Sequence, residues 1–206
     1  MNDQAIRISS DHIGNALNEI RYPGSWANND YLYDLRVIDQ ILSTNGTSTD
    51  ILARKFTFEW LLVSIITERL NYQRRIFGLE VLDETETRVQ ACDAICIDGR
   101  QRFRELVTWS ILYYLYVRVD LEFSLQELSD MLSYSPRTMR RYRTAGIQSL
   151  IQYLFWVEWH ACSAKSTNLI NDRSRMAGVP EYTSSPVLSE RWWLLSLVRQ
   201  VFESAR

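Results

Sequence analysis

The stretch SLQELSDMLSYSPRTMRRYR, residues 124–143, carries the clearest local pattern in the chain. Ser124 and Glu127 have the residue types and the spacing of a reciprocal cap at a helix start. Three leucines then recur at helical spacing along one face: Leu125, Leu128 and Leu132. A short break at residues 133–135 follows, and Pro136 suits the first position of a second helix, because its missing N–H needs no partner there. The pattern predicts two helices joined by a three-residue turn.

The predicted second helix is strongly basic. It carries four arginines and no acidic residue over its first turns: Arg137, Arg140, Arg141 and Arg143. Because the whole chain has a formal net charge of −2, nucleic-acid binding requires a local patch of this kind. The alternative is a solvated helix face whose arginine stems cover apolar surface. The helix-turn-helix spacing favours DNA contact, since arginine pairs bidentately with guanine and binds phosphate.

The composition bounds the class of protein. Of the 206 residues, 46% are hydrophobic and 23% are charged, which is the balance of a soluble globular protein with one or two domains. Three cysteines are an odd number without the spacing of a disulfide framework. The N-terminus lacks the layout of a signal peptide, and the longest apolar run, residues 60–66, is too short to cross a bilayer. We therefore expect a reduced, cytoplasmic protein with no membrane association.

Nearly every segment repeats its apolar residues at helical period, and no segment alternates as a strand would. The predicted fold class is an all-α helical bundle with an embedded helix-turn-helix and a C-terminal helix. The expected helices cover about residues 10–20, 30–42, 51–77, 100–118, the helix-turn-helix with its second helix reaching 159, and a last helix from 185. The expected divisions are an N-terminal helical domain (1–99), a helix-turn-helix domain (100–160) and a linker with the C-terminal helix (161–206).

Local signals mark several of these boundaries. Asp83 and Glu86 resemble a capping box before a further helix, which Gly99 would separate from the next one. Asp50 is a candidate cap for the long helix that starts at residue 51. In the helix expected at 30–42, four residues would face inward: Leu32, Leu35, Ile38 and Leu42. Residues 163–186 are polar and weakly patterned, which is typical of a linker.

The stretch around residues 103–150 resembles region four of bacterial sigma factors and the related helix-turn-helix of response regulators. In that pattern an apolar helix leads into S-L-x-E-[IL]-x-x-x-L, a short turn and S-x-x-T-[VM]-R. The matching residues are Ser124, Leu125, Glu127, Leu128, Leu132, Ser135, Thr138, Met139 and Arg140. Ser135 and Thr138 join the candidate DNA-binding set, although such residues at a helix start more often cap and pack than read bases.

Two positions depart from that family pattern. Ser133 stands where a Gly commonly makes the left-handed turn, so we expect the turn to be wider or strained. Ser129 stands where a small Ala usually lets the two helices touch. Neither departure forbids the fold.

A second resemblance spans roughly residues 10–160. Some bacterial proteins have a helical N-terminal module holding A-L-x-x-[LI]-x-x-P-x-x-[LW]-A, followed by a sigma-like helix-turn-helix that ends in an aromatic L-W-E-like helix. ALNEIRYPGSWANNDYLYDLRVI (residues 16–38) and LIQYLFWVEW (residues 150–159) are similar to those two landmarks. The module often stands in front of signalling ATPases or other effector domains, which the resemblance implies as partners.

Aromatic residues form a second candidate surface, for a protein partner. They are Tyr153, Trp156 and Trp159, with Phe155 between them, and Trp192 and Trp193 in the last predicted helix. For the first group the slightly favoured alternative is an intramolecular seam against the helix at 51–77. Trp192 and Trp193 are adjacent, so they point in different directions on a helix, which fits a buried tail helix and an interface equally.

The chain has no pattern that indicates catalysis. Cys92, Cys96, His160 and Cys162 fit no zinc-finger spacing, and buried thiols are the better interpretation. No Gly-rich phosphate loop, nucleophile elbow or metalloprotease helix occurs in the sequence. We therefore expect a protein that is not an enzyme, with no metal site and no cofactor.

These patterns predict a DNA-binding transcriptional regulator that binds double-stranded DNA. The helix from Pro136 would enter the major groove, and the helix from Ser124 would cross the backbone. Two alternatives stay open: a protein-interaction or assembly module for a signalling ATPase or other effector, and an atypical sigma factor that binds RNA polymerase through residues 1–99. A homo-oligomer is compatible with each of them.

Overall fold

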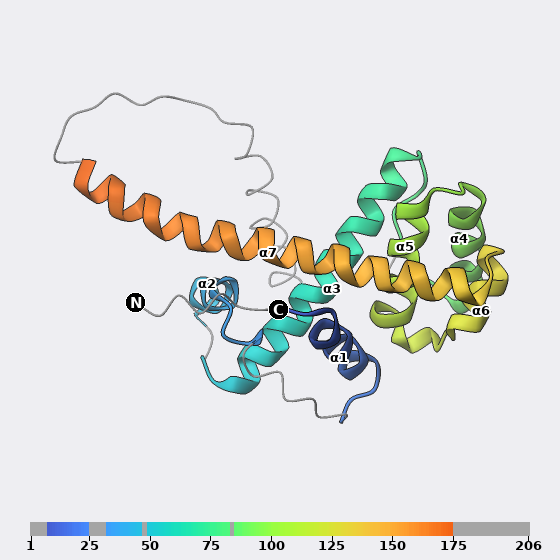
Figure 1. Ribbon diagram of the computed structural model, residues 1–206, viewed down its shortest axis with the longest axis horizontal. Coiled ribbons are helices and arrows are strands. Elements are labelled where there is room, and N and C mark those ends of the chain that lie inside the picture. Colours follow the sequence, from blue (N-terminus) through green and yellow to red (C-terminus); the bar gives the residue numbers. More distant parts are fainter. Residues whose placement is uncertain (1–7, 25–31, 47–48, 83–84, 175–206) are drawn as a thin grey trace.

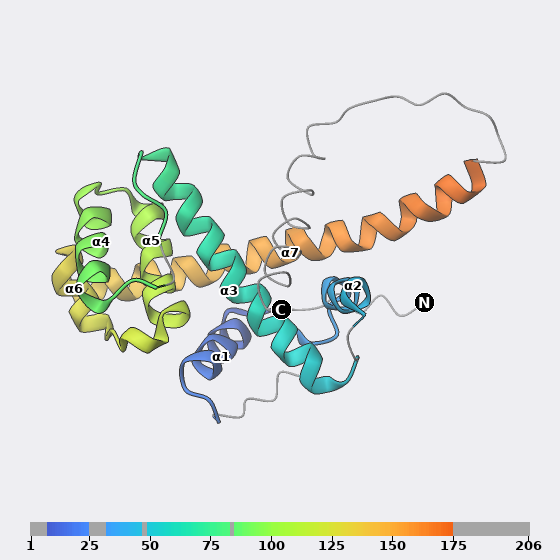
Figure 2. The same cartoon turned by 180° about the vertical axis from the view of Figure 1, so that it is seen from behind.

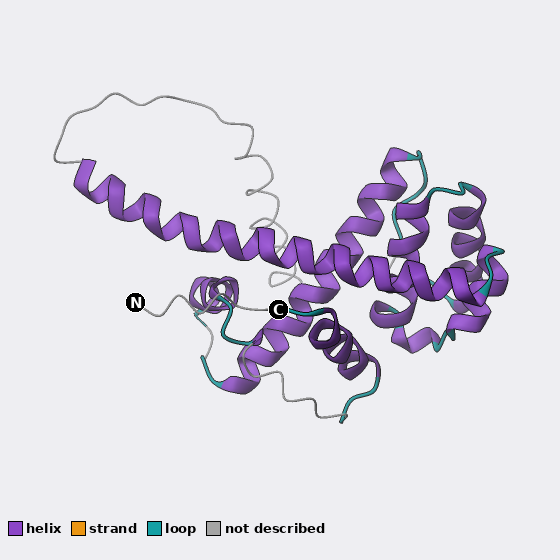
Figure 3. Cartoon of the chain, viewed as in Figure 1, coloured by secondary structure: helices purple, strands orange, loops and turns teal. Residues whose placement is uncertain are grey.

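The computed structural model of the chain describes residues 8–24, 32–46, 49–82 and 85–174, with side chains as far as residue 162. Every regular element in these ranges is helical, and no strand occurs in them (Figure 3). The predicted all-α fold class is therefore confirmed. The helix expected from residue 185, with Trp192 and Trp193, lies outside the described residues.

Seven α-helices and two short irregular helices follow one another along the described chain. They are α1 (Ser10–Arg21), α2 (Arg36–Asn45), α3 (Ile51–Ile76), α4 (Arg88–Arg100), α5 (Arg104–Leu112), a π-helical turn (Tyr113–Val117), a 3-10 turn (Val119–Leu121), α6 (Leu125–Leu132) and α7 (Pro136–Ser174).

The two longest helices, α3 and α7, cross one another and organise the others (Figure 1). α4, α5 and α6 gather around the N-terminal part of α7, while α1 and α2 pack against its middle (Figure 1 and Figure 2). The C-terminal end of α7 projects past the other described helices in both views. At about 1.5 Å per residue, the 39 residues of α7 span about 58 Å.

One continuous apolar core runs through the bundle. α7 contributes a buried stripe at spacings of three, four and eight: Met139, Ile147, Leu150, Leu154, Val157 and Ala161. Burying a side chain such as Leu150 stabilises the fold by roughly 1.5–3 kcal/mol. Gly146 lets α7 approach α5 closely, because a Cβ there would lie 2.9 Å from side-chain atoms of Leu112 and Thr108.

Several predicted helix boundaries are right and others are wrong. α1 and α3 agree with their predicted ranges to within one residue, and the Asp50 carboxylate caps α3 by accepting from the N–H of Ala53 at 2.8 Å. α2 begins at residue 36 instead of 30. Leu32 and Leu35 are fully buried, as predicted, but they lie in the turn before α2. Their three-residue spacing is the same as that of residues on one face of a helix, which is why the sequence predicted an earlier start.

The predicted start and end of α4 are also wrong. Its capping box is formed by Thr87 and Gln90, four residues after the predicted pair of Asp83 and Glu86. Thr-x-x-Gln can form the same reciprocal hydrogen bonds, so the sequence contains two consecutive candidate capping boxes, at 83–86 and 87–90. Gly99 lies inside α4 and α5 begins at Arg104, so this glycine does not end the helix.

α7 is longer than predicted. It continues to Ser174, so residues 163–174 of the predicted linker are helical. A mostly polar sequence carries little periodic signal, which explains why this part resembled a linker. The domain boundaries placed after residues 99 and 160 fall within α4 and α7, respectively.

Candidate nucleic-acid interface

The candidate interface begins with α6, whose start is capped as predicted. Ser124 Oγ accepts the N–H of Glu127 at 3.1 Å, and the Glu127 carboxylate accepts the N–H of Ser124 at 2.8 Å. The N–H of Ser124 holds the pKa of Glu127 below its usual value, and Arg88 lies 2.6 Å from the same carboxylate. The negative charge of Glu127 is therefore balanced by groups of the protein itself, the N–H of Ser124 and the guanidinium of Arg88.

The turn after α6 has the left-handed residue that the family pattern assigns to Gly. Ser133 has φ of +58°. The N–H of Ser133 donates to the carbonyl of Asp130 at 3.2 Å, and the N–H of Tyr134 donates to the carbonyl of Ser129 at 3.1 Å. These two bonds make a Schellman motif, the common C-terminal stop of a helix. The turn is therefore closed and strained at Ser133 rather than widened.

α7 starts immediately after this turn. Ser135 Oγ accepts the N–H of Thr138 at 3.2 Å, and the two hydroxyls lie 2.9 Å apart. The Ser135 carbonyl accepts the N–H of Met139 at 3.0 Å, and Met139 is fully buried beneath the turn. Ser135 and Thr138 thus cap the helix, and their hydroxyls are engaged with one another.

The four candidate arginines divide into two groups. Arg137, Arg140 and Arg141 are exposed on the first two turns of α7, and none of them pairs with a carboxylate of the described chain. Arg143 is half-buried, and its Nε donates to the hydroxyl of Tyr116 at 2.6 Å. Burial raises the pKa of Tyr116, and the Arg143 guanidinium opposes that rise. Arg143 therefore anchors α7 to the π-helical turn.

The solvent face of α6 is acidic. Its exposed polar residues are Gln126, Glu127 and Asp130, and the helix contains no Lys or Arg. The Gln126 amide donates to Asp130 at 3.1 Å. α6 therefore has no cationic side chain with which to hold a phosphate, and the positive charge of this face comes from α7 and its neighbours.

Some of the aromatic side chains further along α7 pack against the core, and others are exposed to solvent. Tyr153 is half-buried, with its ring edge-on to Trp109 and the guanidinium of Arg69 4.4 Å from its centroid. Trp156 is half-buried and its ring lies 4.3 Å from that of His160. Phe155 and Trp159 are 45% and 70% exposed. The structure therefore divides the predicted partner surface between a packed side and an exposed side.

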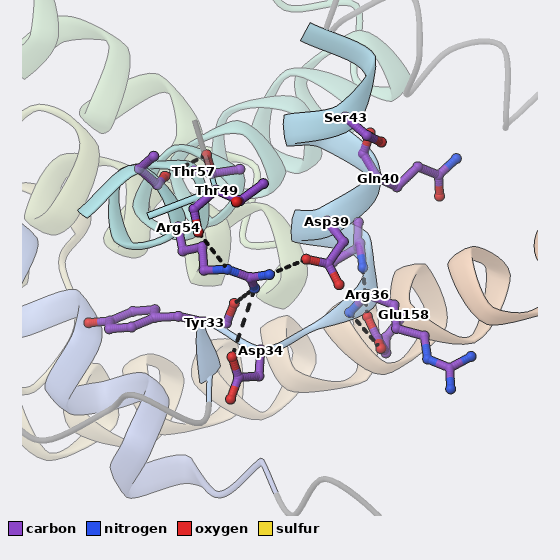
Figure 4. A network of polar contacts seen from close by, with 12 residues as sticks. Tyr33, Asp34, Arg36, Asp39, Gln40, Ser43, Thr49, Arg54, Thr57 and Glu158 are labelled. Atoms are coloured by element: carbon purple, nitrogen blue, oxygen red, sulfur yellow. Dashed lines mark hydrogen bonds and ion pairs between the residues drawn. The ribbon is translucent and has the colours of Figure 1, made fainter. Parts of the chain in front are cut away.

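Glu158 is a structural residue that the sequence did not reveal. Its two carboxylate oxygens accept the N–H groups of Arg36 and Val37, each at 3.0 Å, and so cap α2, which has no side-chain cap of its own (Figure 4). Beside it, the Arg54 guanidinium donates to the carbonyl of Tyr33 at 2.7 Å and pairs with Asp39. This network fixes the middle of α7 to the N-terminal helices.

The four residues considered for a metal site do not come together. Cys92 and Cys96 lie on α4, whereas His160 and Cys162 lie on the distant half of α7 (Figure 1). Within the described residues, no group of three or more potential ligands could hold a metal ion. Burial raises the pKa of both the Cys92 and the Cys162 thiols, which favours the neutral form.

Comparison of the chain with family models, curated proteins and solved structures finds no match. None of the described helices combines the length and the apolar character needed to cross a lipid bilayer. The inference of function therefore rests on the residues and geometry of this chain.

Proposed function

We propose that this protein binds double-stranded DNA through the helix-turn-helix made by α6 and α7, and acts as a transcriptional regulator. The observation that carries the proposal is the group of exposed arginines at the start of α7. Arg137, Arg140 and Arg141 lie on the two turns that directly follow a tight, capped turn. In a docked helix-turn-helix, this is the part of the second helix that reaches base edges and phosphates.

The contrast with five other cations of the described chain supports this choice. These five are paired with nearby carboxylates: Arg54 with Asp34 and Asp39, Lys55 with Glu19 and Glu59, Arg74 with Asp98, Arg88 with Glu127 and Arg118 with Asp120. The arginines at the start of α7 have no such carboxylate in the described chain. In a protein whose net charge is −2, this local excess attracts a polyanion.

The dimensions also agree with groove binding. An α-helix with its side chains is about 10–12 Å wide, and the major groove is about 12 Å wide. Arginine at the start of such a helix can pair bidentately with guanine O6 and N7 or hold a phosphate. α7 enters the groove in this proposal, and α6 crosses the DNA backbone without supplying a cation to it.

A salt titration of duplex binding tests the proposal. Fluorescence anisotropy of labelled genomic fragments is measured with the full chain between about 50 and 200 mM salt. We expect binding at low salt that weakens steeply as salt rises, because neutralised phosphates release counterions. A folded protein that shows no duplex binding at about 50 mM salt overturns the proposal.

One observation favours a second candidate function, an assembly module for an effector such as a signalling ATPase. Phe155 and Trp159 are four residues apart on one face of α7 and are 45% and 70% exposed. Exposed aromatic pairs of this kind mark contact sites for protein partners. Loss of partner binding in Trp159→Ala, with duplex binding absent in both proteins, supports this candidate over the first.

A further inference from the structure

The turn between α4 and α5 is the second concentration of positive charge at this end of the molecule. Within five residues it carries Arg100, Arg102 and Arg104, and all three are exposed. No ion pair joins any of them to a carboxylate of the described chain. The carboxylate of the adjacent Glu105 accepts a hydrogen bond from the side-chain amide of Gln73 at 3.3 Å and forms no ion pair with these arginines in the described chain.

This turn is fixed against the end of α6. A Cβ on Gly99 would lie 3.1 Å from the Cα of Leu132, so the backbones of α4 and α6 touch at this point. One turn earlier, Cys96 Sγ lies 3.8 Å from the carbonyl of Met131. The α4–α5 turn therefore has a set position beside the turn of the helix-turn-helix, although the two are separated by about thirty residues in the sequence.

Two tyrosines connect the α4–α5 turn to the start of α7. The rings of Tyr134 and Tyr142 meet edge to face, with centroids 5.5 Å apart. The guanidinium of Arg104 lies 5.9 Å from the centroid of Tyr142. Burial raises the pKa of Tyr134, and the charge of Arg102 opposes that rise. Arg104 thus lies beside Tyr142 of α7, and Arg102 precedes it by two residues in the same turn.

We propose that the α4–α5 turn is a second nucleic-acid contact site, in which Arg102 and Arg104, with Arg100 beside them, hold phosphates of the DNA backbone that borders the groove occupied by α7. This inference rests on the proposed function and extends it to a surface outside the helix-turn-helix. A helix in the major groove has a phosphate backbone on each side. The acidic α6 supplies no cation for that contact, whereas the α4–α5 turn, with Arg104 beside Tyr142, does.

The site has a distinct expected role. Contacts to phosphate position a protein on the duplex and carry no sequence information, whereas contacts to base edges set sequence preference. The arginines of the α4–α5 turn should therefore add affinity equally for all duplexes. Those at the start of α7 should contribute both affinity and preference.

The test compares Arg102→Asn and Arg104→Gln with a matched control, Arg36→Gln. Asn is chosen at residue 102 because Arg102 has φ of +51°, a left-handed conformation that Asn tolerates. Arg36 is exposed on α2, far from this end of the bundle, and its replacement removes the same charge (Figure 1). Duplex affinity is measured at several salt concentrations for two fragments of different sequence, with circular dichroism for each variant.

The expected result is a smaller salt dependence for the two turn variants. The slope of log affinity against log salt should fall by about 0.9 for each phosphate that the variant no longer neutralises, equally on both fragments. Arg36→Gln should keep the wild-type slope. Arg104→Lys should also keep it, because lysine still binds phosphate as a point charge.

Three results would overturn the inference. The first is wild-type affinity and slope in both turn variants while the wild-type chain binds duplex, which leaves the proposed function intact. The second is an equal loss in Arg104→Lys, which assigns the effect to packing on Tyr142. The third is absence of duplex binding by the wild-type chain, which removes the proposed function as well.

Discussion

Ser129 and Tyr134 exchange two hydrogen bonds that close the turn between α6 and α7. The N–H of Tyr134 donates to the carbonyl of Ser129 at 3.1 Å, and the Ser129 hydroxyl donates to the carbonyl of Tyr134 at 2.5 Å. Ser129 is buried at 2% exposure and Tyr134 is half-buried, so the pair is largely removed from water. The Ser129 hydroxyl therefore ties α6 to the turn that precedes α7.

The first prediction concerns this hydroxyl. Ser129→Ala should lower the free energy of unfolding by about 1–2 kcal/mol, because the Tyr134 carbonyl loses a buried donor. The helix stop itself should remain, since its backbone bonds do not involve the hydroxyl. Urea denaturation measures the change, and a variant as stable as the wild type would show that the carbonyl finds another donor.

Ser133→Gly should be neutral or raise the unfolding free energy by up to about 1 kcal/mol. Ser133 is exposed and has φ of +58°, where a Cβ is costly and Gly is not. The flexibility that Gly adds to the unfolded chain offsets part of the gain. Thermal denaturation gives the comparison, with Ser133→Val as the control that should be clearly destabilised. A clear loss of stability in the Gly variant would contradict the turn geometry.

Glu158→Ala should destabilise the bundle by about 1–3 kcal/mol. The change leaves the N–H groups of Arg36 and Val37 without the carboxylate that caps α2. Gln152→Ala, at an exposed position on the same helix, is the control and should stay within about 0.5 kcal/mol of the wild type. Equal effects of the two changes in chemical denaturation would mean that Glu158 does not cap α2.

Whether a feature of the fold or of the candidate site could be predicted depends on how far apart in the sequence the interacting residues are. The capping box of Ser124 and Glu127, the turn and the start of α7 are local, so their pattern predicted them correctly. The inward leucines of the second helix were also predicted, but Leu32 and Leu35 precede it. The spacing of these two leucines in the turn is the same as the spacing of inward residues in a helix, so only the backbone conformation shows where the turn ends and α2 begins.

The misses are of longer range. Glu158 caps a helix that begins 122 residues earlier, and nothing near either residue indicates the pair. Arg143 belongs to the predicted DNA-binding set, and nothing in the sequence indicates that its Nε also donates to the hydroxyl of Tyr116, 27 residues away. Arg100, Arg102 and Arg104 were overlooked because their position beside the turn depends on the contact of Gly99 with Leu132.

Stability should fall with rising pH because of Asp98. Burial raises the pKa of Asp98 from 3.8 to about 6, although Arg74 opposes the shift. Between these values the folded chain binds more protons than the unfolded chain, so stability decreases as pH rises through this window. Denaturation at a series of pH values should show a smaller decrease for Asp98→Asn. Parallel pH profiles for the two proteins would place the Asp98 pKa near its ordinary value.

The central claim is that the arginines of α7, and not its exposed aromatic face, carry the function. The most direct measurement is duplex affinity by anisotropy for the wild type, Arg140→Glu with Arg141→Glu, and Trp159→Ala, each confirmed as folded by circular dichroism. Reversed charge repels phosphate, so we predict at least about a tenfold loss for the arginine variant and wild-type affinity for Trp159→Ala. Unchanged duplex affinity in the folded arginine variant would contradict the account.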